Sequence, residues 1–171
     1  MKVTVSNISD PGGLDVKIEP GKGWVRSAVE RAVEAPGNAS GTLLFIREGS
    51  RVTVTGSLDV TSSLPCERCL EAVPLALDVD VDLIFVPASQ APSAHIEVEL
   101  EENDLDVGYF ENDELSVEDL VCEAIALEMP TRIVCDDELA CDERTARLLA
   151  GRGAAGPTDE HPFAALKGRF H

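Results

Sequence analysis

The sequence is poor in the side chains that most often carry acid–base and nucleophilic chemistry. Its 171 residues include only three histidines, His95, His161 and His171. A hydrolytic triad or a histidine proton relay therefore has little to draw on. A glycine-rich phosphate loop is also missing, because the glycine cluster at 151–156 follows no predicted strand and has no P-loop lysine. These absences favour a protein that binds over one that catalyses, and we expect no enzyme.

Long apolar runs are missing as well. The N-terminus, Met1-Lys-Val-Thr-Val-Ser-Asn, lacks the apolar stretch of a signal peptide, and no run of about eighteen apolar residues could span a membrane. The five cysteines are an odd number, which does not fit a framework of paired disulfides. Since 44% of the residues are hydrophobic, the chain can still bury a core. We expect a soluble cytoplasmic protein with reduced thiols.

Basic residues are scarce, and their shortage is local. The chain has 14 Lys and Arg against 32 Asp and Glu, a formal net charge of −18. Residues 78–143 hold 21 of the acids and a single base, Arg132. Such a surface repels phosphate, so non-specific nucleic-acid binding through this acidic segment is disfavoured. The segment serves either solubility alone or the attraction of a basic partner protein.

What the chain does have is a tight pair of thiols, Cys66-Glu-Arg-Cys69. A two-residue spacer lets a turn point both sulfurs at one spot, which suits a zinc knuckle or a redox disulfide. A closed zinc site needs two further ligands, and the candidates are Cys135 and Cys141, although their spacing of five residues exceeds the usual two to four. The metal hypothesis is one zinc ion held by Cys66, Cys69, Cys135 and Cys141. The alternative is reduced thiols at a strand turn.

A redox role for Cys66 and Cys69 is the enzyme alternative. Redox pairs of the thioredoxin type sit at a helix N-terminus, where the helix dipole lowers the thiol pKa, whereas here a strand pattern follows. The context therefore disfavours the redox role. The fifth cysteine, Cys122, falls inside a predicted helix and is interpreted as a small buried hydrophobic residue.

The hydrophobic pattern predicts an α+β protein. Alternating apolar residues predict strands at 2–6, 14–18, 42–47, 51–60, 73–83, 96–101 and 105–110. Helical spacing predicts helices at 24–34 and 116–129, the second capped by Ser116 and ended by Pro130. Short connections favour an antiparallel sheet or partly closed barrel, with the cysteine turn at the tip of a long hairpin. We expect one domain at 1–150, then a flexible linker and a short docking segment at 151–171.

Contact with RNA is expected on basic residues outside the acidic segment. Arg26 and Arg31 share a predicted helix and Arg68 lies in the cysteine turn, so these three are the candidate contacts with RNA or a partner. We expect a contact in two parts, in which the acids engage a basic ribosomal or assembly protein while the arginines touch RNA weakly. The other basic residues considered are Arg47, Arg51, Arg144, Arg147, Arg152, Lys167 and Arg169.

Several motifs taken together resemble one known family. They are Cys66-Glu-Arg-Cys69-Leu-Glu after a strand, Glu123-Ala-Ile-Ala-Leu-Glu-Met-Pro130 closing a helix, a downstream cysteine segment, and His161-Pro-Phe-Ala-Ala-Leu166. This combination resembles the bacterial YceD family, the large ribosomal RNA subunit accumulation proteins, over most of the chain. Many relatives carry a denser cysteine cluster after the proline, where this chain has Cys135 and Cys141.

The resemblance implies a non-enzymatic factor for accumulation of the large-subunit ribosomal RNA, through its synthesis, processing or stability, and for ribosome assembly. Such a factor is described as binding metal and nucleic acid. Its partners would be ribosomal RNA or a pre-ribosomal particle, with no membrane and no small-molecule substrate. The alternative function is a zinc-stabilised protein-binding adaptor that makes no RNA contact.

Overall fold

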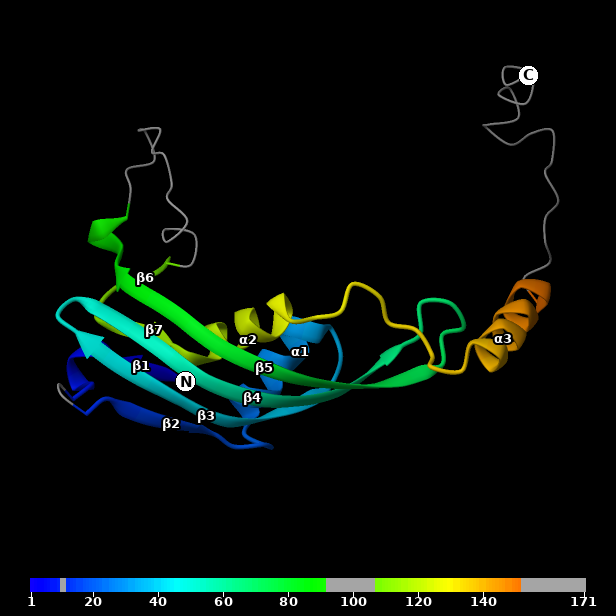
Figure 1. Cartoon of the computed structure of the whole chain (residues 1–171), viewed down its shortest axis with the longest axis horizontal. Helices are drawn as coiled ribbons and strands as arrows, with labels where there is room; N and C mark the ends of the chain where they lie inside the picture. The colour runs from blue at the N-terminus through cyan, green and yellow to red at the C-terminus, as the bar shows by residue number, and fades with distance from the viewer. Residues whose placement is uncertain (10–11, 92–106, 152–171) are drawn as a thin grey trace, which may run out of the picture. The chain divides into compact units, whose positions relative to one another are not determined.

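The computed structural model describes residues 1–9, 12–91 and 107–151, which belong to two compact units. Unit 1 comprises Met1–Leu64 and Pro74–Thr131, and unit 2 comprises Pro65–Val73 and the chain from Arg132 onward. Each unit is therefore assembled from two separate stretches of chain. Figure 1 labels the helices and strands used below.

A five-stranded sheet in the order β2-β3-β4-β5-β6 forms the main layer of unit 1. β3 pairs antiparallel with both β2 and β4, whereas β6 pairs parallel with β5. The turn with Cys66 and Cys69 joins the neighbouring strands β4 and β5, as the predicted hairpin requires. The strands are β2 (Leu14–Ile18), β3 (Gly37–Glu48), β4 (Arg51–Pro65), β5 (Ala72–Pro87) and β6 (Val107–Phe110).

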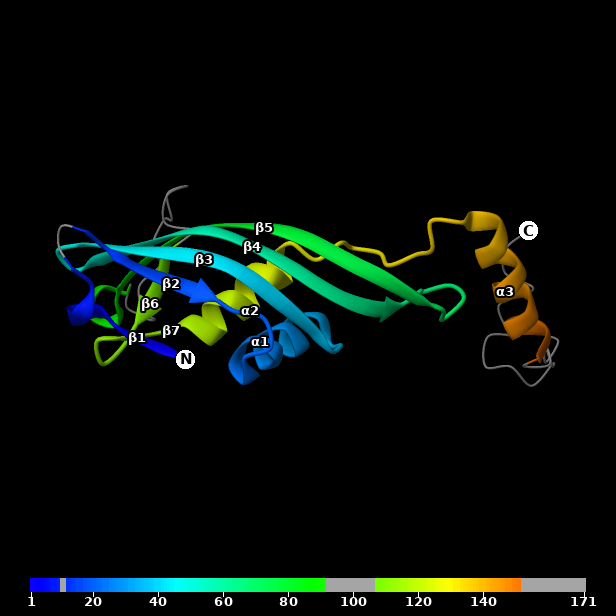
Figure 2. The same cartoon turned by 90° about the horizontal axis from the view of Figure 1, so that it is seen from below.

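The predicted α+β class is confirmed, but the sheet departs from the expected antiparallel sheet or partly closed barrel in two respects. β5 and β6 run parallel, which needs a long connection, and the chain between Pro87 and Val107 is long enough to supply one. The sheet is also open, because its two edge strands, β2 and β6, do not pair with each other. Figure 2 shows the sheet bending over the helices instead of closing on itself.

Helices α1 (Gly23–Val33) and α2 (Val117–Leu127) cover one face of this sheet (Figure 2). The helical spacing of the sequence predicted both. Ser116 caps α2 as expected, since its Oγ accepts a hydrogen bond from the Asp119 N–H at 3.3 Å. The largest fully buried side chains between sheet and helices are Phe45, Leu43, Leu58, Ile125, Val25, Val29, Val52, Val54, Val60, Val79, Val117 and Val121.

A second, two-stranded sheet fixes the beginning of α2. Strand β1 (Lys2–Thr4) pairs antiparallel with β7 (Glu114–Ser116), which runs directly into that helix. β7 follows β6 through Asn112 and Asp113, whose φ angles of 53° and 60° are those of a tight type I′ turn. The first residues of the chain thus lie next to residues more than a hundred positions later.

Unit 2 contains the cysteine turn and helix α3 (Glu138–Gly151). Only two helices were predicted, and α3 was missed because Cys141 is its one buried residue, so it has no apolar stripe. Its start is nevertheless well capped, since Asp137 Oδ1 accepts a hydrogen bond from the Ala140 N–H at 3.0 Å.

Two predictions fall largely or wholly on residues that the structure does not describe. The strand at 96–101 lies outside the described residues, as does the linker and docking segment after Gly151. The division of the chain at residue 150 therefore stays a prediction. Among the helices of the described ranges, none has the length and apolar character needed to cross a membrane.

Candidate metal centre

The turn from Cys66 to Cys69 is closed by its own backbone. The Leu70 N–H donates to the Cys66 carbonyl at 2.9 Å, and the Cys66 N–H donates to the Glu71 carbonyl at 2.7 Å. The Arg68 N–H donates to Cys66 Sγ at 3.4 Å. Leu70 has a φ of 62°, a left-handed conformation that costs a residue with a Cβ about 1 kcal/mol. The reversal at Leu70 turns the chain back into β5.

Two hydrogen bonds tie the second cysteine segment to this turn. The Glu67 N–H donates to the Ile133 carbonyl at 2.9 Å, and the Ile133 N–H donates to Glu67 Oε1 at 3.1 Å. Cys135 follows two residues later. The Asp137 cap then starts α3, and the Cys141 N–H donates to the Asp137 carbonyl at 3.0 Å. Cys141 therefore lies in the first turn of a helix whose start is fixed.

The four thiols predicted from the sequence come together. Their Sγ atoms all lie within 4.8 Å of one another, with 3.7 Å between Cys66 and Cys141 and 3.5 Å between Cys69 and Cys135. Four sulfurs bound tetrahedrally to zinc at about 2.3 Å stand about 3.8 Å apart. Donor type, number and spacing thus all fit one zinc ion. Cys122, which lies half-buried in α2, is not among the four.

These thiols are also the core of unit 2. Cys66, Cys69 and Cys141 are 0%, 5% and 1% exposed, and they are the only buried residues in the part of unit 2 that the structure describes. Cys135 and Val73 pack against them half-buried. A small unit without an aliphatic core needs a disulfide or a metal to stay folded. All five cysteines are free, and the four clustered thiols could hold a metal as such a cross-link.

The metal-free cluster carries its protons unevenly. Hydrogen bonds from the backbone of Cys69 and then of Arg68 lower the pKa of Cys66 to about 6, against the effect of burial. The Arg144 guanidinium lowers the pKa of Cys69. Burial raises the pKa of Cys135, and raises that of Cys141 to about 12. Near neutral pH Cys66 is therefore a thiolate while Cys135 and Cys141 hold their protons, and a bound metal must displace at least these two protons.

Sequence reasoning missed the site role of Arg144, which it considered only as a base. In α3, Arg144 Nε donates to Cys69 Sγ at 3.4 Å and its Nη2 donates to Cys135 Sγ at 3.3 Å. The sequence did contain a signal for this role of Arg144. Arg144 follows Cys141 by three positions, a spacing that puts both side chains on one face of a helix.

The arginines predicted to touch RNA lie in different surroundings. Arg26 and Arg31 are both exposed on α1, but Arg31 donates to Asp119 Oδ1 at 2.8 Å and lies 3.7 Å from a Glu118 carboxylate oxygen. Arg68 forms an ion pair with Asp142. Only Arg26 makes no ion pair within the described residues, so the charge of the other two is largely compensated. Their contact with RNA stays a prediction.

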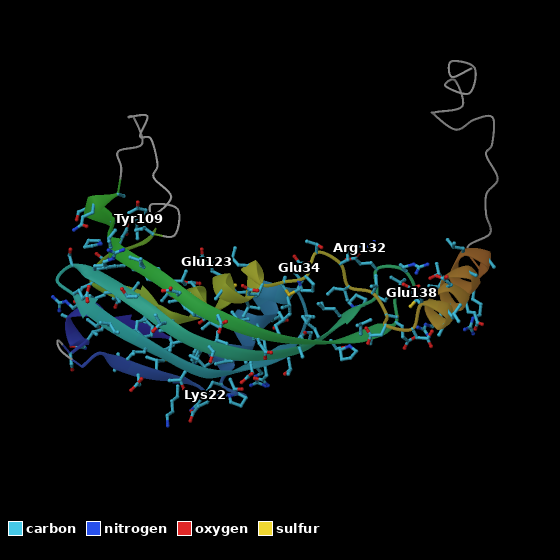
Figure 3. All side chains as sticks on the ribbon, in the orientation of Figure 1. Lys22, Glu34, Tyr109, Glu123, Arg132 and Glu138 are labelled. Carbon is cyan, nitrogen blue, oxygen red and sulfur yellow. The ribbon has the colours of Figure 1, made fainter. Side chains whose placement is uncertain are left out.

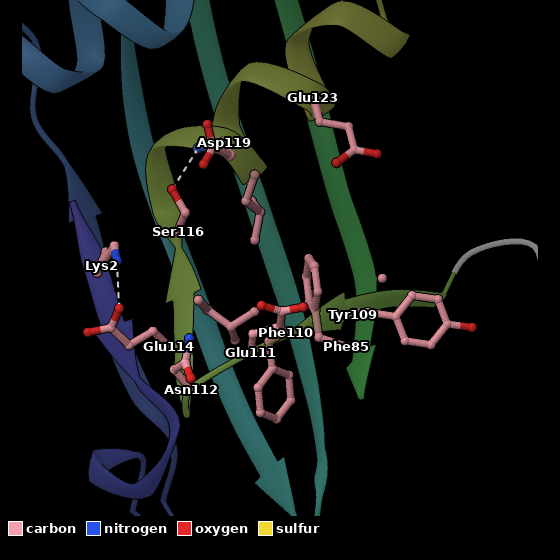
Figure 4. Close-up of a pocket in the computed structure, with 13 residues that line it drawn as sticks. Lys2, Phe85, Tyr109, Phe110, Glu111, Asn112, Glu114, Ser116, Asp119 and Glu123 are labelled. Atoms are coloured by element: carbon pink, nitrogen blue, oxygen red, sulfur yellow. Dashed lines mark hydrogen bonds and ion pairs between the residues drawn. The ribbon is translucent and has the colours of Figure 1, made fainter. Parts of the chain in front are cut away.

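Unit 1 carries a separate acidic cavity of about 460 Å³, lined by β6, β7 and the start of α2 (Figure 4). Phe85, Tyr109 and Phe110 provide aromatic rings, and Lys2, its one lining base, is paired with Glu114 at 2.6 Å. Figure 3 labels Tyr109 and Glu123 among the other side chains of this unit. The acidic residues of the lining are Glu111, Glu114, Asp119 and Glu123. Such a lining suits a cation.

Comparison with known proteins bears on the same part of the chain. The model of the family described as large ribosomal RNA subunit accumulation protein YceD matches residues 54–168, a range that includes all four clustered thiols. No curated protein and no solved structure matches the chain. The match covers well over half of the sequence, and the chain belongs to the YceD family of large ribosomal RNA subunit accumulation proteins.

Proposed function

We propose that this chain is a non-enzymatic binding factor for accumulation of the large-subunit ribosomal RNA and for ribosome assembly, with unit 2 folded around one zinc ion. The family supports the process. The observation that carries the metal is the core of unit 2, whose buried residues in the described part are all cysteines with sulfurs within 4.8 Å. A zinc ion closed by four thiolates has no open position for a substrate, so its role is structural.

Elemental analysis of protein purified without affinity-tag metals tests this proposal. We expect close to one zinc per chain, lost in Cys66→Ser and in Cys135→Ser. Cys122→Ser is the matched control, because Cys122 lies in α2 outside the cluster, and it should keep the zinc. A wild-type protein that is metal-free and equally stable would contradict the proposal.

The partner we propose for the acidic segment is a basic ribosomal or assembly protein. The cavity of unit 1 supports this choice, because Glu111 and Glu123 form no ion pair within the described residues. A lysine or arginine of the partner can place its charge near these carboxylates and its stem against Phe85 and Tyr109. Charge complementarity of this kind speeds association and sets specificity.

Affinities for pre-ribosomal particles and for bare large-subunit RNA, measured over a salt series, test this arrangement. The double variant Glu111→Gln and Glu123→Gln should bind particles about tenfold more weakly. Asp15→Asn with Asp59→Asn, on exposed positions of β2 and β4 outside the acidic segment, makes the same charge change away from the cavity and should have little effect. Tight binding to bare RNA that persists when Arg26, Arg31 and Arg68 become Ser would contradict the two-part contact.

Two other functions make different predictions. An adaptor without RNA contact should leave ribosome profiles unchanged on depletion, whereas the proposed factor should reduce large subunits. A thiol oxidoreductase would use the low pKa of Cys66, but that residue is fully buried and the Cys66–Cys69 turn leads into β5, not into a helix. Reduction of insulin at thioredoxin-like rates would favour the oxidoreductase.

A further inference from the structure

The four clustered thiols form two unlike pairs. Cys66 and Cys141 are 0% and 1% exposed, so solvent does not reach their sulfurs. Cys135 is half-buried, and a cavity of about 350 Å³ lies beside its neighbour Cys69. This cavity is lined by Cys69, Glu71, Arg144, Arg147 and Leu148, all of unit 2. A chelator or thiol reagent can therefore approach the cluster at the edge formed by Cys69 and Cys135.

The Arg144 guanidinium stands on that same edge. Its Nε donates to Cys69 Sγ at 3.4 Å and its Nη2 donates to Cys135 Sγ at 3.3 Å, so one planar group bridges two sulfurs that lie 3.5 Å apart. The rigid fork of a guanidinium matches two acceptors at this separation, whereas an ammonium is a point charge. Both hydrogen bonds that Arg144 makes within the described residues go to these sulfurs.

Such a bridge matters for a thiolate metal site. Zinc with four thiolates has a net charge of about −2, and a guanidinium remains charged at any ordinary pH. Hydrogen bonds from outside the ligand set orient the ligands and change metal affinity by about 10–100-fold. Arg147 lines the same cavity but donates its Nε to the Glu143 carbonyl of its own helix at 3.3 Å. It therefore offers the same charge without the bridge.

We propose that Arg144 is a positioning residue of the metal centre, which aligns Cys69 and Cys135 for zinc and shields the edge through which the ion leaves. This inference rests on the zinc of the proposed function. Zinc release begins at the Cys69 and Cys135 edge, and the bonds from zinc to the buried pair Cys66 and Cys141 break last.

The test uses the zinc-loaded full-length chain and the variants Arg144→Gln, Arg144→Lys and Arg147→Gln. Competition with a chromophoric chelator should show that Arg144→Gln binds zinc about 10–100-fold more weakly and transfers it faster. Arg144→Lys should recover part of the loss, because an ammonium restores the charge but not the fork. Arg147→Gln should match the parent. The cobalt(II) spectrum of each variant should keep its four-thiolate tetrahedral form, which separates lost positioning from unfolding.

Limited alkylation with N-ethylmaleimide, read by mass spectrometry, tests the order of release. Cys69 and Cys135 should be modified first, and faster in Arg144→Gln than in Arg147→Gln. Three results would overturn this inference and leave the proposed metal site standing. They are parental zinc affinity in Arg144→Gln, an equal loss of affinity in Arg147→Gln, and first modification at Cys66 or Cys141. A parent that binds no zinc would overturn the proposed metal site and this inference together.

Discussion

Unit 1 and unit 2 differ in what they bury. Unit 1 packs aliphatic and aromatic side chains such as Phe45, Leu43 and Ile125 between its sheet and two helices, all of them fully enclosed. In the described part of unit 2 the buried residues are thiols only. Apolar burial stabilises by roughly 25 cal/mol per Å² whatever else is present, whereas a thiol core stabilises mainly when a metal joins it. The core of unit 1 therefore needs no ligand, and on the proposed function the fold of unit 2 depends on its bound ion.

Removal of the metal should have the largest effect on the difference between the two units. With zinc chelated under reducing conditions, unit 2 should lose the cross-link proposed for its four thiols and unfold, while unit 1 keeps its apolar core. Hydrogen exchange should then show complete loss of amide protection at 65–73 and 132–151, with α1 and β3 still protected. Protection that survives chelation in both units would contradict the comparison.

Truncation of a core side chain of unit 1 should lower the stability of that unit without removing the zinc of unit 2. Phe45→Ala removes a fully buried ring from β3 and should lower the free energy of unfolding by about 3–5 kcal/mol in urea titrations. Ile46→Ala, one position along the same strand, is the control because Ile46 is 39% exposed, and it should cost about 1 kcal/mol or less. Folded Phe45→Ala protein should still hold one zinc. A similar cost for both variants would show that the burial argument fails.

The uneven protonation of the thiols predicts how zinc binding depends on pH. Cys135 and Cys141 have raised pKa values and hold their protons near neutrality, whereas the pKa of Cys66 is lowered to about 6 and that of Cys69 is also lowered. Binding should then release at least the two protons of Cys135 and Cys141, so affinity should rise by a factor of about 100 or more per pH unit between about pH 7 and 8. Below about pH 6, Cys66 also takes up a proton and the slope steepens. Chelator competition over this range checks it, and an affinity independent of pH would refute it.

The smallest expected effect concerns the strained turn at Leu70. Its φ of 62° disfavours a residue with a Cβ, while its side chain is 61% exposed and contributes little packing. Leu70→Gly should therefore stabilise the zinc-loaded protein by up to about 1 kcal/mol in thermal unfolding. Leu70→Val should have the opposite sign, because a β-branched residue tolerates this conformation least. A destabilising Leu70→Gly would mean that the leucine side chain packs usefully.

The features that sequence reasoning found are those whose signals are local. Alternating residues marked β2 to β5, and Ser116 with Pro130 marked the ends of α2. The four thiols could be grouped because soft ligands are few in this chain and a closed zinc site needs four. Grouping them did not require a prediction of how the strands pair.

The features that sequence reasoning missed depend on contacts between distant residues. Nothing local to residues 107–110 tells a parallel partner from an antiparallel one, so the parallel pairing of β6 with β5 was not predicted. α3 has only one buried residue and so lacks the periodic pattern that reveals a helix. The ion pairs of Arg31 with Asp119 and of Arg68 with Asp142 join residues 88 and 74 positions apart, which no local pattern encodes.

The interleaving of the two units along the chain has a consequence for biosynthesis. Cys66 and Cys69 leave the ribosome long before Cys135 and Cys141, and residues 74–131 of unit 1 emerge between them. Joining the two thiol pairs in an unfolded chain would close a long loop at a large entropic cost, whereas a folded unit 1 has already ordered most of that loop. The nascent chain should therefore load its ion last, and no contiguous fragment can contain the whole metal centre without that intervening stretch of unit 1.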